Sequence, residues 1–376
     1  MNQLLDDLPA MDVAGRITHL RGAIEARELD AGEVDALLVS KLVNVRYLTG
    51  FTGSAGLLLV LPGEVVLVTD GRYGQQASEQ LAAAGVDARV EVSGTAQREL
   101  AAEAVAEAGV RRLGLEADAV TWAQQRTYAD SWFPDVELAP TVGAVDDLRL
   151  VKDAGEVARI EAAASIADQA LARVRSRLLE SPTEAEFGIE LDFEIRRLGA
   201  SGNSFETIVA SGPNGAKPHH RPSARTIVEG DLVVIDFGAV VDGYCSDMTR
   251  TVMVGEPSAT QARMLEVVTA AQQAGVDAVG DGVATADVDA ACRRVIDDAG
   301  WGDAFLHATG HGVGLEIHEA PRVAATADAT LTPGVVVTVE PGVYLPTHGG
   351  VRVEDTLVVT RDGSRPLTST PKTTAV

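Results

Sequence analysis

Two strand-like segments that meet at Asp242-Gly243 constrain this chain more than any other feature of its sequence. The segments, residues 231–240 and 244–254, are rich in β-branched residues, and Asp-Gly is favoured in two-residue type I′ hairpin turns. A turn of this kind pairs the segments in a single register, in which Asp236 lies opposite Thr249. The sequence therefore predicts an antiparallel hairpin that carries a carboxylate inside one strand.

The predicted register brings a second carboxylate to the same face. Asp247 lies two residues from Thr249, so Asp236 and Asp247 are diagonal neighbours about 7–8 Å apart at Cα, a spacing that suits one metal centre. Asp236 also follows the apolar run 232–235, where an ionised carboxylate is costly unless it is paired or bound to metal. A three-residue loop would place the carboxylates on opposite faces, and a strand-end Asp that accepts backbone hydrogen bonds is the simpler alternative.

Histidines gather in the same half of the chain, where six of the seven occur between residues 219 and 348. They are His219, His220, His307, His311, His318 and His348. Glycines at 310, 312 and 314 surround His311 and make a helix unfavourable, so this segment differs from the zinc-protease helix with two histidines one turn apart. Metal or acid–base chemistry is the functional interpretation, and a glycine-rich surface loop is the alternative.

Two glutamates follow apolar or alternating segments near the C-terminus. Glu340 ends the run 335–339 and precedes Pro341-Gly342. In the segment 351–354 the residues alternate, so Arg352 and Glu354 share one face. A simple salt bridge between Arg352 and Glu354 is the alternative to a functional role.

Together these segments predict one metal centre. The candidate ligands are Asp236, Asp247, His311, Glu340 and Glu354. Oxygen-rich ligation with one imidazole suits Mn²⁺, Co²⁺ or Zn²⁺, and bridging carboxylates can hold two such ions about 3.5–4 Å apart and activate water. No Ser/His/Asp nucleophile motif is visible, and Cys245, which lies next to the site, is expected to be a small buried residue rather than a nucleophile.

The hydrophobic patterns divide the chain near residue 150 into an N-terminal α/β domain with a mixed sheet (1–150) and an α+β domain (151–376). Helices are predicted at 13–27, 75–84, 96–108, 119–130, 153–179, 184–198, 258–279 and 285–299, with Ser258 and Thr285 as N-caps. Further strands are predicted at 36–40, 56–61, 64–69, 88–92, 112–116, 137–139, 204–210, 335–340 and 351–360, the strand at 137–139 being stopped by Pro140. The first domain has no Gly-x-Gly-x-x-Gly turn, so a dinucleotide site is not expected.

Composition narrows the classes of partner. The 376 residues include 31 Lys and Arg against 55 Asp and Glu, a net charge of −24, which argues against nucleic acid and anionic membranes as partners. No apolar run approaches a membrane span, and the N-terminus lacks the pattern of a signal peptide. Two cysteines cannot form a disulfide framework. We therefore expect a cytoplasmic globular protein.

Four ordered motifs resemble the pita-bread metallopeptidases, and most closely the branch of Xaa-Pro aminopeptidases and Xaa-Pro dipeptidases (prolidases). They are Leu-Val-Val-Ile-Asp-Phe-Gly with Gly-Tyr-Cys-Ser-Asp-Met-Thr-Arg-Thr, His-Ala-Thr-Gly-His-Gly-Val-Gly, Thr-Val-Glu-Pro-Gly and Gly-Gly-Val-Arg-Val-Glu-Asp. The resemblance extends into the first half through residues 44–56 and 69–73. It implies a creatinase-like N-terminal domain and a pita-bread catalytic domain. We also expect a homodimer.

The resemblance also implies roles for individual residues. The five candidate ligands would hold two divalent ions, usually Mn²⁺ or Co²⁺, and Glu340 would also handle the proton of the attacking water. His219 and His318 match positions that contact the substrate and steady the tetrahedral intermediate, and His307 and Arg352 match pocket positions. His220 stands where close relatives often have Gly, which leaves open which of His219 and His220 points into the site, although the register favours His219.

The predicted activity is hydrolysis of the bond between an N-terminal residue and a following proline in peptides, as an Xaa-Pro aminopeptidase. A dipeptidase restricted to Xaa-Pro dipeptides is the alternative within the class, and a non-catalytic binding protein on the same fold is the alternative outside it. Arg72 and Tyr73 either reach a neighbouring subunit's cleft or only pack after a strand.

Overall fold

The computed structural model describes residues 5, 7–26, 33–373 and 375, which form two compact units. One unit comprises residues 12–149, and the other comprises residues 150 onward together with the segment up to residue 11. The predicted end of the first helix at Arg27 lies outside the described residues, and the helix is observed at Val13–Glu25. Within the described residues, no helix is both long and apolar enough to cross a membrane.

The unit of residues 12–149 is built on a six-stranded mixed sheet, as predicted, with strand order β4-β3-β2-β1-β5-β6. The strands are β1 (Ala36–Val39), β2 (Gly56–Val60), β3 (Val65–Thr69), β4 (Arg89–Val92), β5 (Arg112–Glu116) and β6 (Glu137–Thr141). The helices are α2 (Val13–Glu25), α3 (Leu42–Thr49), α4 (Gly74–Ala83), α5 (Gln97–Glu107) and α6 (Trp122–Thr127), which a π-helical turn (Tyr128–Trp132) extends. Helix α3 was not predicted.

Pro140 corrects one prediction in this unit. It does not stop the last strand, because β6 continues through Pro140 to Thr141. Strand β6 is at the edge of the sheet and pairs only with β5, so the missing N–H of proline removes no hydrogen bond to a second neighbour.

Arg72 and Tyr73 lie on an exposed turn that follows β3. The Arg72 guanidinium is 2.8 Å from Asp70 Oδ2 and lies 4.9 Å from the centre of the Tyr73 ring. The Tyr73 hydroxyl is 2.7 Å from Ser54 Oγ. Both side chains therefore make local contacts, and their action across a subunit interface stays a prediction.

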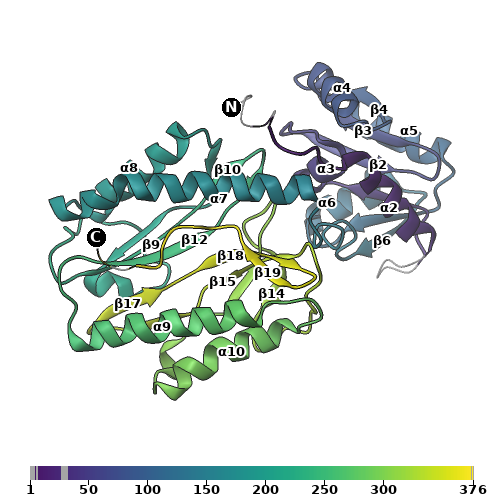
Figure 1. Cartoon of the computed structure of the whole chain (residues 1–376). Helices are drawn as coiled ribbons and strands as arrows, with labels where there is room; N and C mark the ends of the chain where they lie inside the picture. The colour runs from purple at the N-terminus through teal and green to yellow at the C-terminus, as the bar shows by residue number, and fades with distance from the viewer. Residues whose placement is uncertain (1–4, 6, 27–32, 374, 376) are drawn as a thin grey trace. The chain divides into compact units, whose positions relative to one another are not determined.

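The second unit has four long helices and two principal sheets. The helices are α7 (Ala154–Val174), followed by a 3₁₀ turn (Arg175–Glu180), α8 (Glu184–Arg197), α9 (Ala259–Ala278) and α10 (Thr285–Asp298). The sheets have the orders β12-β9-β8 and β14-β13-β15-β18-β19. In Figure 1 the strands of this unit run between α7 and α8 on one side and α9 and α10 on the other.

The strands of this unit include several short ones. They are β7 (Gly202–Asn203), β8 (Ile208–Ser211), β9 (Leu232–Phe237), β10 (Ala239–Val241), β11 (Tyr244–Cys245), β12 (Met248–Met253), β13 (Gly310–Gly312), β14 (Glu319–Val323), β15 (Val336–Val339), β16 (Gly342–Leu345), β17 (Gly349–Arg352), β18 (Asp355–Thr360) and β19 (Gly363–Pro366). The predicted strand at 204–210 is wrong in its bounds, since the chain there is irregular between β7 and β8.

Local sequence rules explain where most of these helices begin. Asp153, Thr183 and Ser258 each accept a hydrogen bond from the backbone three residues later, and the Glu or Gln there closes a capping box. The prediction of Thr285 as an N-cap is wrong. Ala284 has that position, because its β-bridge to Thr330 sets the entry of α10.

Each helix pair covers its own sheet with apolar side chains. Helices α7 and α8 pack on β9 and β12 through a cluster that includes Leu171, Phe187 and Ile235, all fully buried. Helices α9 and α10 pack on β15 and β18 through a second cluster that includes Val268 and Val337. Apolar burial thus holds the two sheets in place, and their strand ends carry the polar residues described next.

Candidate metal centre

The hairpin at Asp242-Gly243 has the predicted turn and register. Both residues have positive φ, +45° and +77°, as a type I′ turn requires. Val241 pairs with Tyr244, and Asp236 on β9 lies opposite Thr249 on β12. Asp247 directly precedes β12, so the two carboxylates lie on the same face of the hairpin.

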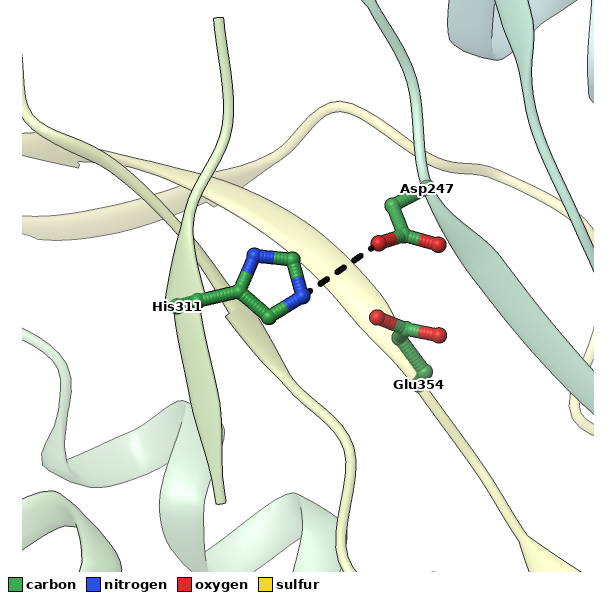
Figure 2. A group of neighbouring side chains, drawn as sticks. All are labelled: Asp247, His311 and Glu354. Atoms are coloured by element: carbon green, nitrogen blue, oxygen red, sulfur yellow. Dashed lines mark ion pairs between the residues drawn. The ribbon is translucent and has the colours of Figure 1, made fainter. Parts of the chain in front are cut away.

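Three further ligand candidates come from the segment between β13 and β18. His311 is the middle residue of β13, Glu340 follows β15, and Glu354 lies between β17 and β18. Asp247, His311 and Glu354 offer ligand atoms that all lie within 4.8 Å of one another. Figure 2 shows these three side chains pointing toward a common point from separate segments of the chain.

The His311 imidazole presents a lone pair to this point. Its Nδ1 lies 3.0 Å from the Gly312 carbonyl oxygen, which can only accept, so Nδ1 carries the proton. Nε2 then faces Asp247 Oδ2 and Glu340 Oε1, each at 3.5 Å. Burial lowers the pKa of His311 to about 4, which keeps the imidazole neutral near pH 7.

The carboxylates of the centre are crowded and buried. Burial, and then the negative charge of Asp236, raise the pKa of Glu354 to about 8. Burial and the neighbouring carboxylates also raise the pKa values of Asp247 and Glu340 well above the ordinary range. So many acidic groups in a site with little solvent require a compensating cation.

Two buried oxygen atoms test whether a metal fits this centre. Asp236 Oδ1 and Glu354 Oε1 have no hydrogen-bond partner among the described residues. Buried carboxylate oxygens nearly always have a partner, and a divalent ion is a partner that needs no proton. With a neutral imidazole and four carboxylates, the donor set suits Mn²⁺, Co²⁺ or Zn²⁺.

Arg352 is the cation that the chain itself supplies. Its guanidinium Nη2 is 2.5 Å from Asp236 Oδ2, and its Nε donates to Thr249 Oγ1 at 3.1 Å. The Thr249 hydroxyl in turn donates to Glu354 Oε2 at 2.7 Å. The alternative of a simple Arg352–Glu354 salt bridge is therefore wrong: Arg352 pairs with Asp236, and Glu354 is reached through a threonine.

Tyr344 is a residue of the site that the sequence analysis missed. Its hydroxyl accepts from Arg352 Nη1 at 2.8 Å and lies 2.9 Å from His307 Nε2. Since His307 Nδ1 donates to the Ala308 carbonyl at 2.7 Å, the tyrosine must donate to His307. Burial raises the pKa of Tyr344 to about 12 and lowers that of His307 to about 4, so both stay neutral. Nothing in the local sequence marks Tyr344 as a site residue, because the fold brings it to its partners Arg352 and His307.

Three further histidines near the centre, His219, His220 and His318, have different surroundings. The His318 ring centre is 4.4 Å from that of His311, and the side chain is exposed. His219 is exposed as well, whereas His220 Nε2 lies 2.9 Å from the buried carboxylate of Glu184. Of the adjacent pair, His219 is thus the one left available.

All nine predicted site residues line one cavity of about 780 Å³. They are His219, Asp236, Asp247, His307, His311, His318, Glu340, Arg352 and Glu354. This volume is typical of a small-molecule or peptide site. A cavity lined by carboxylates and a neutral imidazole is typical of metal-dependent hydrolases.

Comparison with known proteins narrows this class. Residues 158–361 match metallopeptidase family M24, and residues 16–151 match the creatinase/prolidase N-terminal domain. The chain belongs to metallopeptidase family M24, with the pita-bread catalytic fold and the creatinase-type N-terminal domain that its motifs predicted.

Individual relatives cover nearly the whole chain. An uncharacterized peptidase, YqhT, of Bacillus subtilis (strain 168) is 41% identical over 339 residues, 90% of this chain and 95% of that protein. The structure of an Xaa-Pro dipeptidase from Bacillus anthracis is 39% identical with a TM-score of 0.91, covering 97% of this chain and 100% of that one. An X-Pro aminopeptidase from Thermotoga maritima MSB8 is 34% identical with a TM-score of 0.85, covering 91% and 98%. The chain is therefore an M24 metallopeptidase of the Xaa-Pro peptidase group.

Proposed function

We propose that this protein is a two-metal aminopeptidase that hydrolyses the bond between an N-terminal residue and a following proline. The observation that carries the proposal is the pair of buried, unpartnered oxygens, Asp236 Oδ1 and Glu354 Oε1, beside a neutral His311. A proline on the far side of the scissile bond leaves an imide without an N–H, so recognition depends on the shape of the cavity and on contacts to the carbonyl.

Asp236, Asp247, His311, Glu340 and Glu354 would hold the two ions, for which Mn²⁺ is the proposed identity. The ions would polarise the scissile carbonyl and make a bound water acidic. Glu340 lines the cavity and is 18% exposed, which suits a carboxylate that accepts the proton of the attacking water and returns it to the leaving nitrogen.

The cationic and imidazole groups around the centre would act on the substrate. His219 and His318 are exposed within the cavity and can donate to the carbonyl oxygen as negative charge develops there. Arg352 and His307 are linked through the Tyr344 hydroxyl, so their orientation is set by buried hydrogen bonds. Side chains held in this way need no rearrangement during the reaction.

The size of the cavity supports an aminopeptidase, since about 780 Å³ exceeds the volume of a dipeptide severalfold.

A dipeptidase is the second candidate, and Arg322 favours it. Arg322 is exposed, lines the cavity and has no hydrogen bond or ion pair among the described residues. A free guanidinium in a substrate cavity suits the C-terminal carboxylate of a dipeptide.

Kinetics with matched peptides would separate the two candidates. The Mn²⁺-loaded enzyme is assayed with Xaa-Pro dipeptides, the same dipeptides as C-terminal amides, and Xaa-Pro-Yaa tripeptides. An aminopeptidase cleaves tripeptides and tolerates the amide, and Arg322→Ala has little effect. A dipeptidase cleaves only the free dipeptide, and Arg322→Ala raises its KM.

Arg221→Ala is the matched control, because Arg221 also lines the cavity but is 3.1 Å from Glu206 in an exposed ion pair.

Asp236→Ala and Glu354→Ala should each abolish metal binding and activity together. Full activity in either variant would contradict the proposed function, as would two bound metals with no cleavage of any Xaa-Pro peptide.

A further inference from the structure

The segment 212–222, which carries His219, is tied down at both ends by one buried carboxylate. Glu184, in the first turn of α8, has a side chain that is 0% exposed. Its Oε1 accepts from the backbone N–H and the hydroxyl of Ser211, both at 2.7 Å. Its Oε2 accepts from the backbone N–H of Ser223 at 3.1 Å and from the hydroxyl at 2.6 Å. Glu184 therefore closes the segment into a loop.

His220 attaches the middle of this loop to the same carboxylate. Its Nε2 is 2.9 Å from Glu184 Oε2, and its side chain is only 13% exposed. Burial alone would raise the pKa of Glu184, but the hydrogen bonds from Ser223, Ser211 and His220 lower it to about 2. Glu184 is thus ionised near pH 7 and can only accept, so His220 Nε2 is the donor.

Adjacent histidines in this loop face different surroundings. His220 binds the buried carboxylate, while His219 is exposed in the cavity. The backbone between them is constrained by a turn in which the His220 N–H donates to the Lys217 carbonyl at 3.2 Å. Holding His220 therefore limits where the His219 side chain can project.

The opposite side of the loop is attached to the metal centre. The Pro218 carbonyl accepts from Arg352 Nη1 at 3.3 Å, and the same guanidinium is 2.5 Å from Asp236. The residue before His219 is thus linked to a ligand candidate, and the residue after it is linked to Glu184. His219 lies between two fixed points.

From this arrangement we propose that Glu184 and His220 are positioning residues, which hold the His219 imidazole over the metal centre. The inference rests on the proposed function and assigns a role to two residues outside the reacting groups. A small displacement of a group that contacts the reacting carbonyl lowers the rate, because catalysis depends on precise placement of the reacting groups.

Steady-state kinetics of the Mn²⁺-loaded enzyme on an Xaa-Pro substrate tests the proposal with His219→Ala, His220→Ala, His220→Gln and the double variant. His220→Ala should lower kcat/KM about tenfold, the size of one lost hydrogen bond to a charged group, mainly through kcat. His220→Gln, which keeps an N–H donor, should recover most of the loss. In the His219→Ala background, His220→Ala should change kcat/KM less than about twofold, because the effect passes through His219.

Ser223→Ala is the matched control, because its hydroxyl donates to the same Glu184 oxygen at 2.6 Å. It should lower Tm as much as His220→Ala does while leaving kcat and KM near wild type. Equal kinetic losses in Ser223→Ala and His220→Ala would overturn the positioning role and leave only a structural one. Additive losses in the double variant would overturn it as well.

An activity-independent measurement separates this inference from the proposed function. The seven histidines can be labelled with carbon-13 at Cε1 and assigned by substitution. In the metal-free protein, His220→Ala should shift or broaden the His219 signal, and His220→Gln should restore it. If the wild type cleaves no Xaa-Pro peptide, the proposed function fails, and the His219 signal still decides the positioning. An unchanged His219 signal in His220→Ala would overturn it.

Discussion

Replacing Glu184 by Gln should remove a pH-dependent part of the stability of the unit that contains the metal centre. Glu184 is fully buried, and its pKa falls from an ordinary value of 4.5 to about 2. A displacement of this size corresponds to about 3 kcal/mol of unfolding free energy at pH 7.

The sign of the effect follows from proton binding. Because the folded pKa is depressed, the unfolded chain binds the proton more readily, and the stabilisation is complete above the unfolded value of about 4.5. It is lost as the pH falls from about 4.5 toward 2. Glu184→Gln should therefore be less stable than wild type by about 3 kcal/mol at pH 7 and by much less near pH 2.

Denaturant unfolding at a series of pH values checks this prediction, provided the signal reports on the correct unit. Of the three tryptophans, Trp122 and Trp132 belong to the unit of residues 12–149, and Trp301 belongs to the other. A Trp122→Phe/Trp132→Phe background therefore makes fluorescence specific for the unit with Glu184. Taking the difference between wild type and variant at each pH cancels the titration of all other groups.

Glu186→Gln is the matched control on the same helical turn. Glu186 is exposed and serves the capping box of Thr183, a position that Gln also suits, so this replacement should cost far less than that of Glu184. The reasoning would be refuted if Glu184→Gln destabilised the unit by less than about 1 kcal/mol at pH 7. It would also be refuted if the difference from wild type stayed constant between pH 6 and pH 3.

Three further outcomes are expected. Because the pKa of Glu354 is raised to about 8 without metal, Glu354 must lose a proton when Mn²⁺ binds. Calorimetry should therefore show that the affinity for Mn²⁺ rises from pH 6 to pH 8. An affinity that does not change with pH would contradict this. Lys152→Met breaks a buried ion pair with Glu319, in which the charged atoms are 3.2 Å apart and the side chains are 1% and 6% exposed. It should lower the free energy of unfolding by about 3 kcal/mol, whereas Arg263→Ala, at an exposed pair, should lower it by under about 1 kcal/mol. Equal losses would argue against a desolvated pair. Gly243→Ala places a side chain at φ +77° and should lower the free energy of unfolding, measured by thermal denaturation, by about 1 kcal/mol. Gly280→Ala, at a glycine without a positive φ, should lower it by no more than a few tenths of a kcal/mol. Similar values for the two variants would contradict the role given to the turn.

Much of the fold could be predicted because its signals are local. The Asp242-Gly243 turn sets a register for the whole hairpin, since a period of two carries the pairing outward to Asp236 and Thr249. The capping residues Asp153 and Ser258 mark helix starts through hydrogen bonds that span three residues. Side chains near in sequence decide both features.

The failures have physical reasons as well. Helix α3 has no side-chain cap at its start, and Gly50, with φ +74° directly after the helix, is the local signal that could have indicated it. Thr285 has the chemistry of an N-cap, but a β-bridge between its neighbour Ala284 and Thr330 sets the chain direction there. At Thr285, a contact from a distant part of the chain overrides the local propensity.

By itself, then, the sequence determined which strand ends carry carboxylates and imidazoles, and in which register Asp236 and Asp247 share a face. Only the tertiary structure decided which partner each group takes. Arg352 pairs with Asp236, 116 residues away in the sequence, and not with the nearby Glu354. Glu184 binds His220, whereas the adjacent His219 is exposed in the cavity. Register and capping follow from covalent geometry over a few residues, whereas the choice of partner depends on how two separately packed sheets bring their strand ends together.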